Sequence, residues 1–138
     1  MKGPRFGMKR IFAASLFIAL SLSLSLQAGE GIRVIDGDTV EINGETIRLA
    51  SIDAPETLHA QCDAEKQLGN AATAMLRKLL SKGRVTVARG DPQSGRMIDK
   101  YGRTLGTVYI DGHDAGALLI GAGLARPWTG KRQPWCTP

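Results

Sequence analysis

The chain has 138 residues, with 18 basic and 13 acidic side chains and a formal net charge of +5. This length suits one compact domain, since domains of roughly 100–150 residues are the commonest size. Hydrophobic residues make up 43% and charged residues 22% of the sequence, and these proportions exclude a disordered or collagen-like chain. A polytopic membrane protein is excluded as well, because the sequence contains a single long apolar run.

Residues 1–28 have the pattern of a secretory signal peptide. Basic residues precede the uncharged, apolar segment 11–26, and a small residue, Ala28, follows it. The apolar segment is shorter than the ~20 residues of a membrane span, and an uncleaved anchor is the alternative. The pattern predicts a secreted or periplasmic protein without stable membrane association after cleavage. We expect this protein to be a monomer. Without this segment 14 basic side chains face 13 acidic ones, so the remaining charge of +1 gives no argument for a polyanionic partner.

Two cysteines, Cys62 and Cys136, lie in the part that we expect to be exported. In an oxidising compartment two cysteines usually pair, so we predict a disulfide between them. The alternative is a pair of buried free thiols. The expected organisation is one domain, residues 29–138, stabilised by one disulfide.

Alternation of apolar and polar residues predicts three strands at the start of this domain. The strands cover residues 31–36, 39–43 and 45–53. Asn43-Gly44 is a strong signal for a two-residue hairpin between the second and the third. The third run is interpreted as one continuous strand, with Leu49 on one face and Arg48 and Ile52 on the other.

The apolar spacing then changes to a helical period over residues 63–82, with Ala64, Leu68 and Ala72 in the apolar stripe. Asp63 is the expected N-cap, and Gly83 is the expected residue after the helix. Two further strands are predicted at 84–89 and 104–110, and a short helix at 114–125. This order predicts a mainly β, α+β fold: a five-stranded OB-type barrel with one helix between strands three and four and a short helix after strand five. An open α+β sandwich is the alternative.

Acidic side chains gather around the first turn and around the end of the third strand. They are Asp36, Asp38, Asp53 and Glu56. Carboxylate oxygens suit Ca²⁺, although acidic residues beside glycine or proline are also ordinary in loops. Arg48 lies inside a strand, where a guanidinium needs either a phosphate or a carboxylate partner, so a structural ion pair is its alternative role.

Three separated motifs occur at compatible spacing: VIDGDTV (34–40), IRLASIDAPET (47–57) and DKYGR (99–103). Together they resemble the thermonuclease family, of which staphylococcal nuclease is the namesake. The similarity extends over residues 31–126 in the family's order. The resemblance implies an OB-type barrel and Ca²⁺-dependent hydrolysis of phosphodiester bonds in DNA and RNA.

The resemblance also implies a metal site and a catalytic base. Asp38, Asp53 and the backbone carbonyl of Ala54 match the family's Ca²⁺ ligands. Glu56 matches the residue that activates or orients the attacking water, which is a suitable task for a carboxylate near that water. Arg48 is eight residues from Glu56, about 26 Å if the chain is extended, so the two share a site only if the chain turns back near Asp53–Pro55.

The same resemblance implies how the substrate is held. Arg48 and Arg103 match the arginines that bind the phosphate, and their planar guanidinium groups fit its oxygens. For Arg103 the alternative is a solvated turn. Tyr101 matches a nucleotide contact, and we assign its neighbour Lys100 to substrate binding too. Where the family has further tyrosines this chain has Trp128, which could stack on a base or could close one end of the barrel.

The end of the sequence departs from the family. Because the chain ends at Pro138, we expect the family's longer C-terminal helix to be missing. Lys131 and Arg132 are interpreted either as phosphate contacts or as a solvated tail. The sequence as a whole predicts an exported Ca²⁺-dependent nuclease that cleaves DNA or RNA with little sequence preference. The alternatives are a non-catalytic OB-fold module of the cell envelope that binds nucleic acid or another partner, and a structural envelope protein.

Overall fold

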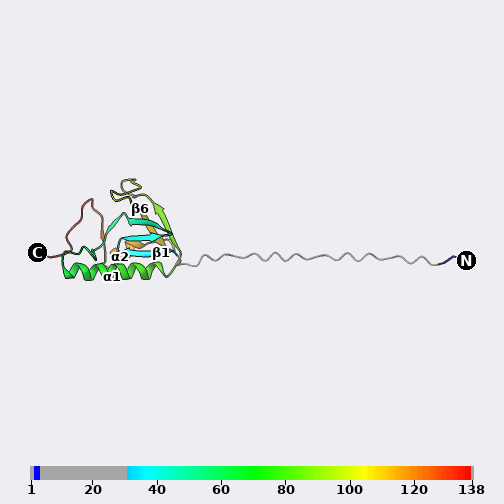
Figure 1. Ribbon diagram of the computed structural model, residues 1–138, viewed down its shortest axis with the longest axis horizontal. Coiled ribbons are helices and arrows are strands. Elements are labelled where there is room, and N and C mark those ends of the chain that lie inside the picture. Colours follow the sequence, from blue (N-terminus) through cyan, green and yellow to red (C-terminus); the bar gives the residue numbers. More distant parts are fainter. Residues whose placement is uncertain (1, 4–30, 138) are drawn as a thin grey trace.

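The computed structural model describes residues 2–3 and 31–137. The predicted signal peptide, residues 1–28, lies outside the described residues apart from Lys2 and Gly3. Within the described part, no helix is both long and apolar enough to cross a bilayer. Residues 31–137 form a strand-rich layer with two helices packed against it (Figure 1).

Five of the six strands of the main sheet lie where the alternating patterns predict them. They are β1 (Ile32–Asp36), β2 (Thr39–Ile42), β3 (Glu45–Leu49), β5 (Val85–Arg89) and β6 (Thr104–Ile110). Their order across the sheet is β1-β2-β3-β6-β5, and the short strand β7 (His113–Asp114) pairs with β6. β3 and β6 run parallel, whereas the other neighbours are antiparallel. Asn43-Gly44 joins β2 to β3 as the predicted hairpin.

The third strand ends earlier than the sequence pattern indicates. The chain turns at residues 50–51 and continues as β4 (Ile52–Asp53), which pairs with β8 (Arg126–Pro127) outside the main sheet. Leu49 and Ile52 are consequently both buried, whereas a continuous strand would place them on opposite faces. The prediction was wrong because the turn contains neither glycine nor proline, the strongest local turn signals.

Two helices flank the sheet, and their ends differ slightly from those predicted. α1 (Asp63–Leu80) has Cys62 rather than Asp63 as its N-cap, and it ends at Leu80, with Ser81 as its C-cap, rather than at residue 82 before Gly83. α2 (Ala115–Gly121) is shorter than the predicted segment 114–125, and the side chain of Asp114 caps its N-terminus. The structure therefore confirms both helices and corrects their boundaries.

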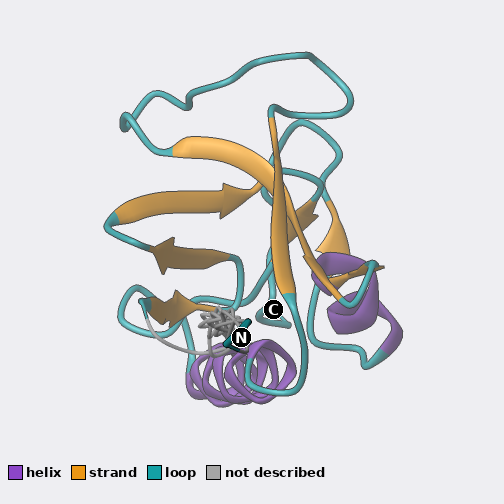
Figure 2. Cartoon of the chain, turned by 90° about the vertical axis from the view of Figure 1, so that its right-hand side faces the viewer, coloured by secondary structure: helices purple, strands orange, loops and turns teal. Residues whose placement is uncertain are grey.

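The hydrophobic core lies between the curved sheet and the two helices. Figure 2 shows α1 beneath one end of the sheet, and α2 packs against β6. The largest buried apolar side chains are Ile47, Ile52, Leu76, Leu119, Val40 and Val108. The mixed α+β class with two helices is confirmed. Backbone hydrogen bonds connect each strand to its neighbour from β1 to β5. Within the described residues, no such pairing joins β1 directly to β5.

The structure joins Cys62 and Cys136 in a disulfide, as the sequence predicts. The bond connects the start of α1 to the C-terminal segment over a sequence separation of 74 residues. A closed loop of that length restricts the unfolded chain strongly, by about 4–5 kcal/mol in the chain-entropy model.

Reduction of this disulfide is therefore expected to lower the melting temperature by about 10 °C or more, since roughly 1 kcal/mol shifts a domain of this size by several degrees. Thermal unfolding with and without a dithiol reductant measures the shift. The Cys62→Ser/Cys136→Ser double variant should melt at the reduced temperature under both conditions. An unchanged melting temperature, or two titratable thiols in the native protein, would refute the predicted contribution of the bond.

Candidate functional site

The turn between β1 and β2 brings two acidic side chains to one edge of the sheet. The pairing of β1 with β2 shifts register between Val34 and Asp36, and such bulges re-aim side chains beside functional sites. Asp38 is only 8% exposed, and its Oδ2 accepts a hydrogen bond from the backbone N–H of Ala54 at 3.0 Å. This contact places the turn directly beside β4, which carries Asp53.

Two glycines allow α1 to support these acidic segments closely. A Cβ on Gly37 would lie 2.7 Å from the Cβ of Ala72 in α1 and 2.9 Å from the Cβ of Ala54. A Cβ on Gly69 of α1 would lie 2.3 Å from the carbonyl oxygen of Glu56. Any side chain at either position would therefore push the helix away from the backbone that carries the candidate site.

Arg48 connects Asp38 to the turn that follows β3. Its Nη2 lies 3.2 Å from Oδ2 of Asp38, and its Nη1 donates to the carbonyl oxygens of Leu49 and Ile52, the latter at 3.0 Å. The bond to Ile52 spans the turn at residues 50–51. The chain therefore already turns at residues 50–51, before the segment Asp53–Pro55 at which the sequence required a turn if Arg48 and Glu56 share a site. Asp38 is thus the carboxylate partner of the structural ion pair that the sequence analysis gave as the alternative role of Arg48.

The carboxyl groups of Asp36 and Asp53 have raised pKa values. Burial, followed by the negative charge of Asp38, raises the pKa of Asp36 to about 6. Burial also raises the pKa of Asp53, although Arg132 and the indole N–H of Trp135 oppose the shift. A raised pKa means that the fold disfavours the ionised carboxylate, and a bound cation would relieve that penalty.

Asp36→Asn is expected to stabilise the Ca²⁺-free protein at pH 8 by an amount on the order of 2 kcal/mol. Because the pKa of Asp36 is raised from 3.8 to about 6, the penalty is full above pH 6 and disappears as the pH falls toward 3.8. The gain in melting temperature should shrink over the same interval. Thermal unfolding of both proteins in chelator between pH 4 and 8 tests this, and a variant no more stable than wild type at pH 8 would contradict it.

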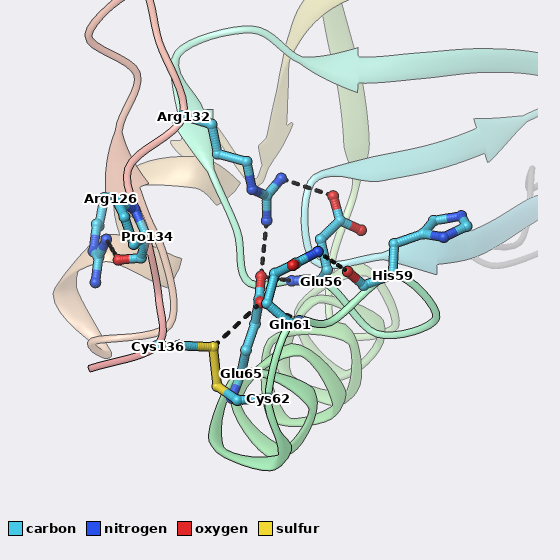
Figure 3. Close-up of a disulfide and its surroundings, with 9 residues drawn as sticks. All are labelled: Glu56, His59, Gln61, Cys62, Glu65, Arg126, Arg132, Pro134 and Cys136. Atoms are coloured by element: carbon cyan, nitrogen blue, oxygen red, sulfur yellow. Dashed lines mark hydrogen bonds and ion pairs between the residues drawn. A yellow bond between two sulfur atoms is a disulfide. The ribbon is translucent and has the colours of Figure 1, made fainter. Parts of the chain in front are cut away.

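Glu56 belongs to a second group of side chains, which is centred on Arg132 (Figure 3). Nη1 of Arg132 lies 2.7 Å from Oε1 of Glu56 and 3.4 Å from Oδ1 of Asp53, and Nη2 lies 3.1 Å from Oε1 of Glu65. Glu65 is 2% exposed and also accepts hydrogen bonds from the backbone N–H groups of Gln61 and Glu56. Burial acts to raise the pKa of Glu65, but these N–H groups and Arg132 hold it below its ordinary value.

A cavity of about 400 Å³ brings together the side chains predicted to bind phosphate and substrate. Its lining includes Arg48, Lys100, Tyr101, Arg103 and Trp128. Tyr101 is 70% exposed, and Nζ of Lys100 and Cζ of Arg103 lie 5.1 and 5.3 Å from the centre of its ring. Nε of Arg103 donates to Asp99 at 2.6 Å. Arg96, which the sequence analysis did not single out, lines the same cavity, so three arginines and two aromatic residues surround one open space.

Glu56 lines a different cavity, of about 310 Å³, together with Arg132 and Trp135. The two cavities are connected by a series of contacts. Arg132 contacts Asp53, the adjacent Ala54 donates to Asp38, and Asp38 pairs with Arg48. The structure therefore connects the predicted base to Arg48 through the acidic side chains, whereas Arg103 pairs with Asp99 and shares only the larger cavity with Arg48.

The oxygen atoms of this centre fit a hard cation. Within the residues that the structure describes, no three Asp, Glu, His or Cys side chains converge as a complete metal cage. Asp38, Asp53 and the carbonyl of Ala54 nevertheless form an oxygen-only donor set, and the latter two already contact the guanidinium of Arg132 at 3.4 Å each. Ca²⁺ takes such oxygen ligands and completes its shell with water, so these residues fit that ion.

The fold and this centre define a small α+β domain that presents carboxylates and arginines around two neighbouring cavities. The profile described as "Staphylococcal nuclease homologue" matches residues 46–135. The chain belongs to that nuclease family.

Several curated proteins are similar to this chain. The micrococcal nuclease of Shigella flexneri is 34% identical over 113 residues, which are 79% of this chain and 58% of that protein. Endonuclease YncB of Bacillus subtilis is 35% identical over 98 residues, or 68% of this chain and 44% of its own length. The succinoglycan biosynthesis protein ExoI of Rhizobium meliloti is 41% identical over 96 residues, or 67% and 48% respectively. The chain thus matches about half the length of these relatives.

Sequence reasoning missed three contributors to the centre. Glu65 is a buried carboxylate in the first turn of α1, Arg132 is an ion-pair partner rather than a solvated tail, and Nε1 of Trp135 donates to Asp53 at 3.2 Å. The one signal in the sequence for these contributors was the predicted disulfide. Pairing Cys136 with Cys62 brings the residues next to Cys136 to the start of α1.

Proposed function

We propose that the protein is an exported Ca²⁺-dependent nuclease that hydrolyses phosphodiester bonds of DNA or RNA with little sequence preference. The observation that carries the proposal is the single cavity shared by Arg48, Arg103, Tyr101 and Trp128, because Arg48 is also paired with the carboxylate of Asp38. Membership of the nuclease family supports the same reaction.

The acidic centre supplies the metal ligands and the base. Asp38, Asp53 and the carbonyl of Ala54 would hold the ion. When bound, Ca²⁺ supplies positive charge that neutralises the phosphate and stabilises charge developing in the transition state. Glu56 would accept a proton from the attacking water, as a positioned carboxylate can. The water oxygen would bond to phosphorus as the bond between phosphorus and the 5′-oxygen breaks, and the leaving 5′-oxygen would take a proton from solvent.

Two arginines and two aromatic side chains would hold the substrate. Arg48 and Arg103 would bind non-bridging phosphate oxygens, where preorganised donors stabilise the charge that builds up in the transition state. Tyr101 and Trp128 present ring faces that stack on any base, and each such stack contributes about 1–3 kcal/mol without sequence preference. Lys100 adds a further positive charge beside Tyr101.

Export is part of the proposal. The basic and apolar pattern of residues 1–28 supports a signal peptide, and the Cys62–Cys136 disulfide suits an oxidising compartment. We infer a secreted or periplasmic location and a monomer without stable membrane association.

Parallel binding and cleavage assays test this function against the non-catalytic alternative. Fluorescently labelled single-stranded DNA and RNA of mixed sequence are incubated with the protein in Ca²⁺ or in chelator. The proposal predicts fragments of many lengths in Ca²⁺ and intact strands in chelator. Binding of either polymer without fragments in Ca²⁺ would contradict the nuclease and favour a binding module, and a structural protein would neither bind nor be stabilised by Ca²⁺ in a thermal melt.

A further inference from the structure

The guanidinium of Arg132 lies where the proposed function needs a metal ion. It contacts four oxygen atoms from four residues: Asp53 and the Ala54 carbonyl at 3.4 Å, Glu65 at 3.1 Å and Glu56 at 2.7 Å. The first two of these oxygens belong to groups assigned to the metal, and the last belongs to the proposed base. Figure 3 shows the Arg132 side chain reaching from the C-terminal segment toward Glu56 and Glu65.

The segment that carries Arg132 is fixed to the body of the protein at several points. The Cys62–Cys136 disulfide anchors its end to α1. Nε1 of Trp135 donates to Oδ2 of Asp53 at 3.2 Å, so this segment contacts both oxygens of that carboxylate. Arg126 stacks on the ring of Trp135 at 3.6 Å and donates to the carbonyl of Pro134 at 2.8 Å. Residues 132–136, which we call the tail plug, therefore form a docked element of the site.

The charges explain why the plug docks there. Asp53 and Glu65 are 4% and 2% exposed, and buried carboxylates are strongly disfavoured unless a cation compensates them. Within the described residues, Arg132 makes the ion pairs of Asp53, Glu56 and Glu65. A single guanidinium thus pairs with all three carboxylates and compensates one of their three negative charges.

We propose that the tail plug is a built-in competitor of the metal ion: Arg132 and Ca²⁺ are alternative occupants of the oxygens of Asp53 and Ala54, and the disulfide keeps the plug within reach. This proposal rests on the proposed function for the identity of the metal ligands. A divalent ion at these oxygens would share ligands with the guanidinium and repel it, so one excludes the other.

The competition would also control the base. With the plug docked, the carboxylate of Glu56 is held in an ion pair with Arg132. Displacement of Arg132 by the metal would free this carboxylate at the same moment as the metal site fills. Because binding linkage is reciprocal, Ca²⁺ must weaken docking of the plug by the same factor by which the plug weakens Ca²⁺ binding.

Calorimetric titration of Ca²⁺ into the full chain at fixed ionic strength tests the competition without measuring activity. Arg132→Gln removes the charge and leaves a shorter polar side chain, and it should lower the Kd for Ca²⁺ by about tenfold, within the 5- to 150-fold range of typical couplings. The neighbouring Lys131→Gln is the matched control, since Lys131 is exposed and loses the same formal charge, and it should change the Kd less than twofold.

Three results would contradict the proposed competition between the tail plug and Ca²⁺. They also distinguish its failure from failure of the proposed function. An unchanged or weaker Kd in folded Arg132→Gln, with Ca²⁺ still bound, overturns the plug alone. An equal tightening by Lys131→Gln does the same, because the effect would then be general electrostatics. No Ca²⁺ binding by any of the three folded proteins overturns both the plug and the Ca²⁺ part of the proposed function.

A fluorescence titration gives a second readout that does not depend on Arg132→Gln folding. The chain has two tryptophans, so Trp128→Phe leaves Trp135 of the plug as the sole indole emitter. Release of Trp135 from Asp53 should shift its emission to the red, with a midpoint equal to the calorimetric Kd. Ca²⁺ binding without any change in Trp135 emission would show that the plug stays docked and would overturn the proposal.

Discussion

Replacing Arg48 with lysine is expected to lower kcat/KM for DNA cleavage by about 100- to 1,000-fold, the usual cost of removing a preorganised donor in a transition-state site. Lysine keeps the charge, but its single ammonium cannot copy the planar fork. In the structure the Arg48 guanidinium reaches Asp38 and the carbonyls of Leu49 and Ile52 at once. These contacts orient the guanidinium, and a lysine ammonium cannot make all of them at once.

Steady-state cleavage rates of Arg48→Lys and wild type in saturating Ca²⁺ measure this effect. Arg33→Lys is the matched control, because Arg33 forms an ion pair with Glu41 on the exposed face of the β1–β2 hairpin, away from the cavity that Arg48 lines. The control should cleave at the wild-type rate. Near-normal cleavage by a folded Arg48→Lys protein would indicate that the pair with Asp38 is structural only.

Glu56→Gln is expected to lower kcat by about 100- to 10,000-fold, the range that a positioned general base contributes. Glutamine has nearly the shape of glutamate but cannot accept the proton of the attacking water. Binding of substrate should change little, because Glu56 does not line the cavity that contains Tyr101 and Trp128. The effect should therefore appear in kcat rather than in the Kd for DNA.

Rapid-quench cleavage and equilibrium binding of the same oligonucleotide separate these two quantities. Glu41→Gln is the control, since Glu41 is a surface carboxylate whose ion-pair partner, Arg33, lies outside both cavities. If kcat of Glu56→Gln equals that of wild type, the assignment of Glu56 as the base is wrong.

Much of the fold follows from local sequence patterns. The alternating runs and the Asn43-Gly44 signal predict the strands and the hairpin, because both depend on neighbouring residues. Ala64 and Glu65 show where such reasoning fails. Alanine in an apolar stripe predicts burial and glutamate predicts exposure, yet Ala64 is exposed and Glu65 is buried. The partners that compensate Glu65 are visible only in three dimensions.

The candidate site shows the same division. Asp38 and Asp53 belong to two separate motifs, and only the family resemblance assigns both to one metal site. In the structure, the backbone N–H of Ala54, the residue after Asp53, donates to Asp38. The contact of Arg132 with Glu56 spans 76 residues of chain, and no periodicity or motif encodes a pair so distant. The turn at Ala50-Ser51 was missed because packing of Ile52 and pairing with β8, rather than local turn chemistry, hold the chain there.

One measurement tests the central claim most directly: the initial rate of cleavage of one DNA and one RNA strand by the full chain in Ca²⁺ and in chelator, with Glu56→Gln assayed in parallel. The account predicts cleavage by the wild type in Ca²⁺ and none in chelator, together with a loss of at least about 100-fold in the variant. Cleavage that is equal in chelator, or equal in the variant, would contradict a Ca²⁺-dependent nuclease site built on Asp38, Asp53 and Glu56.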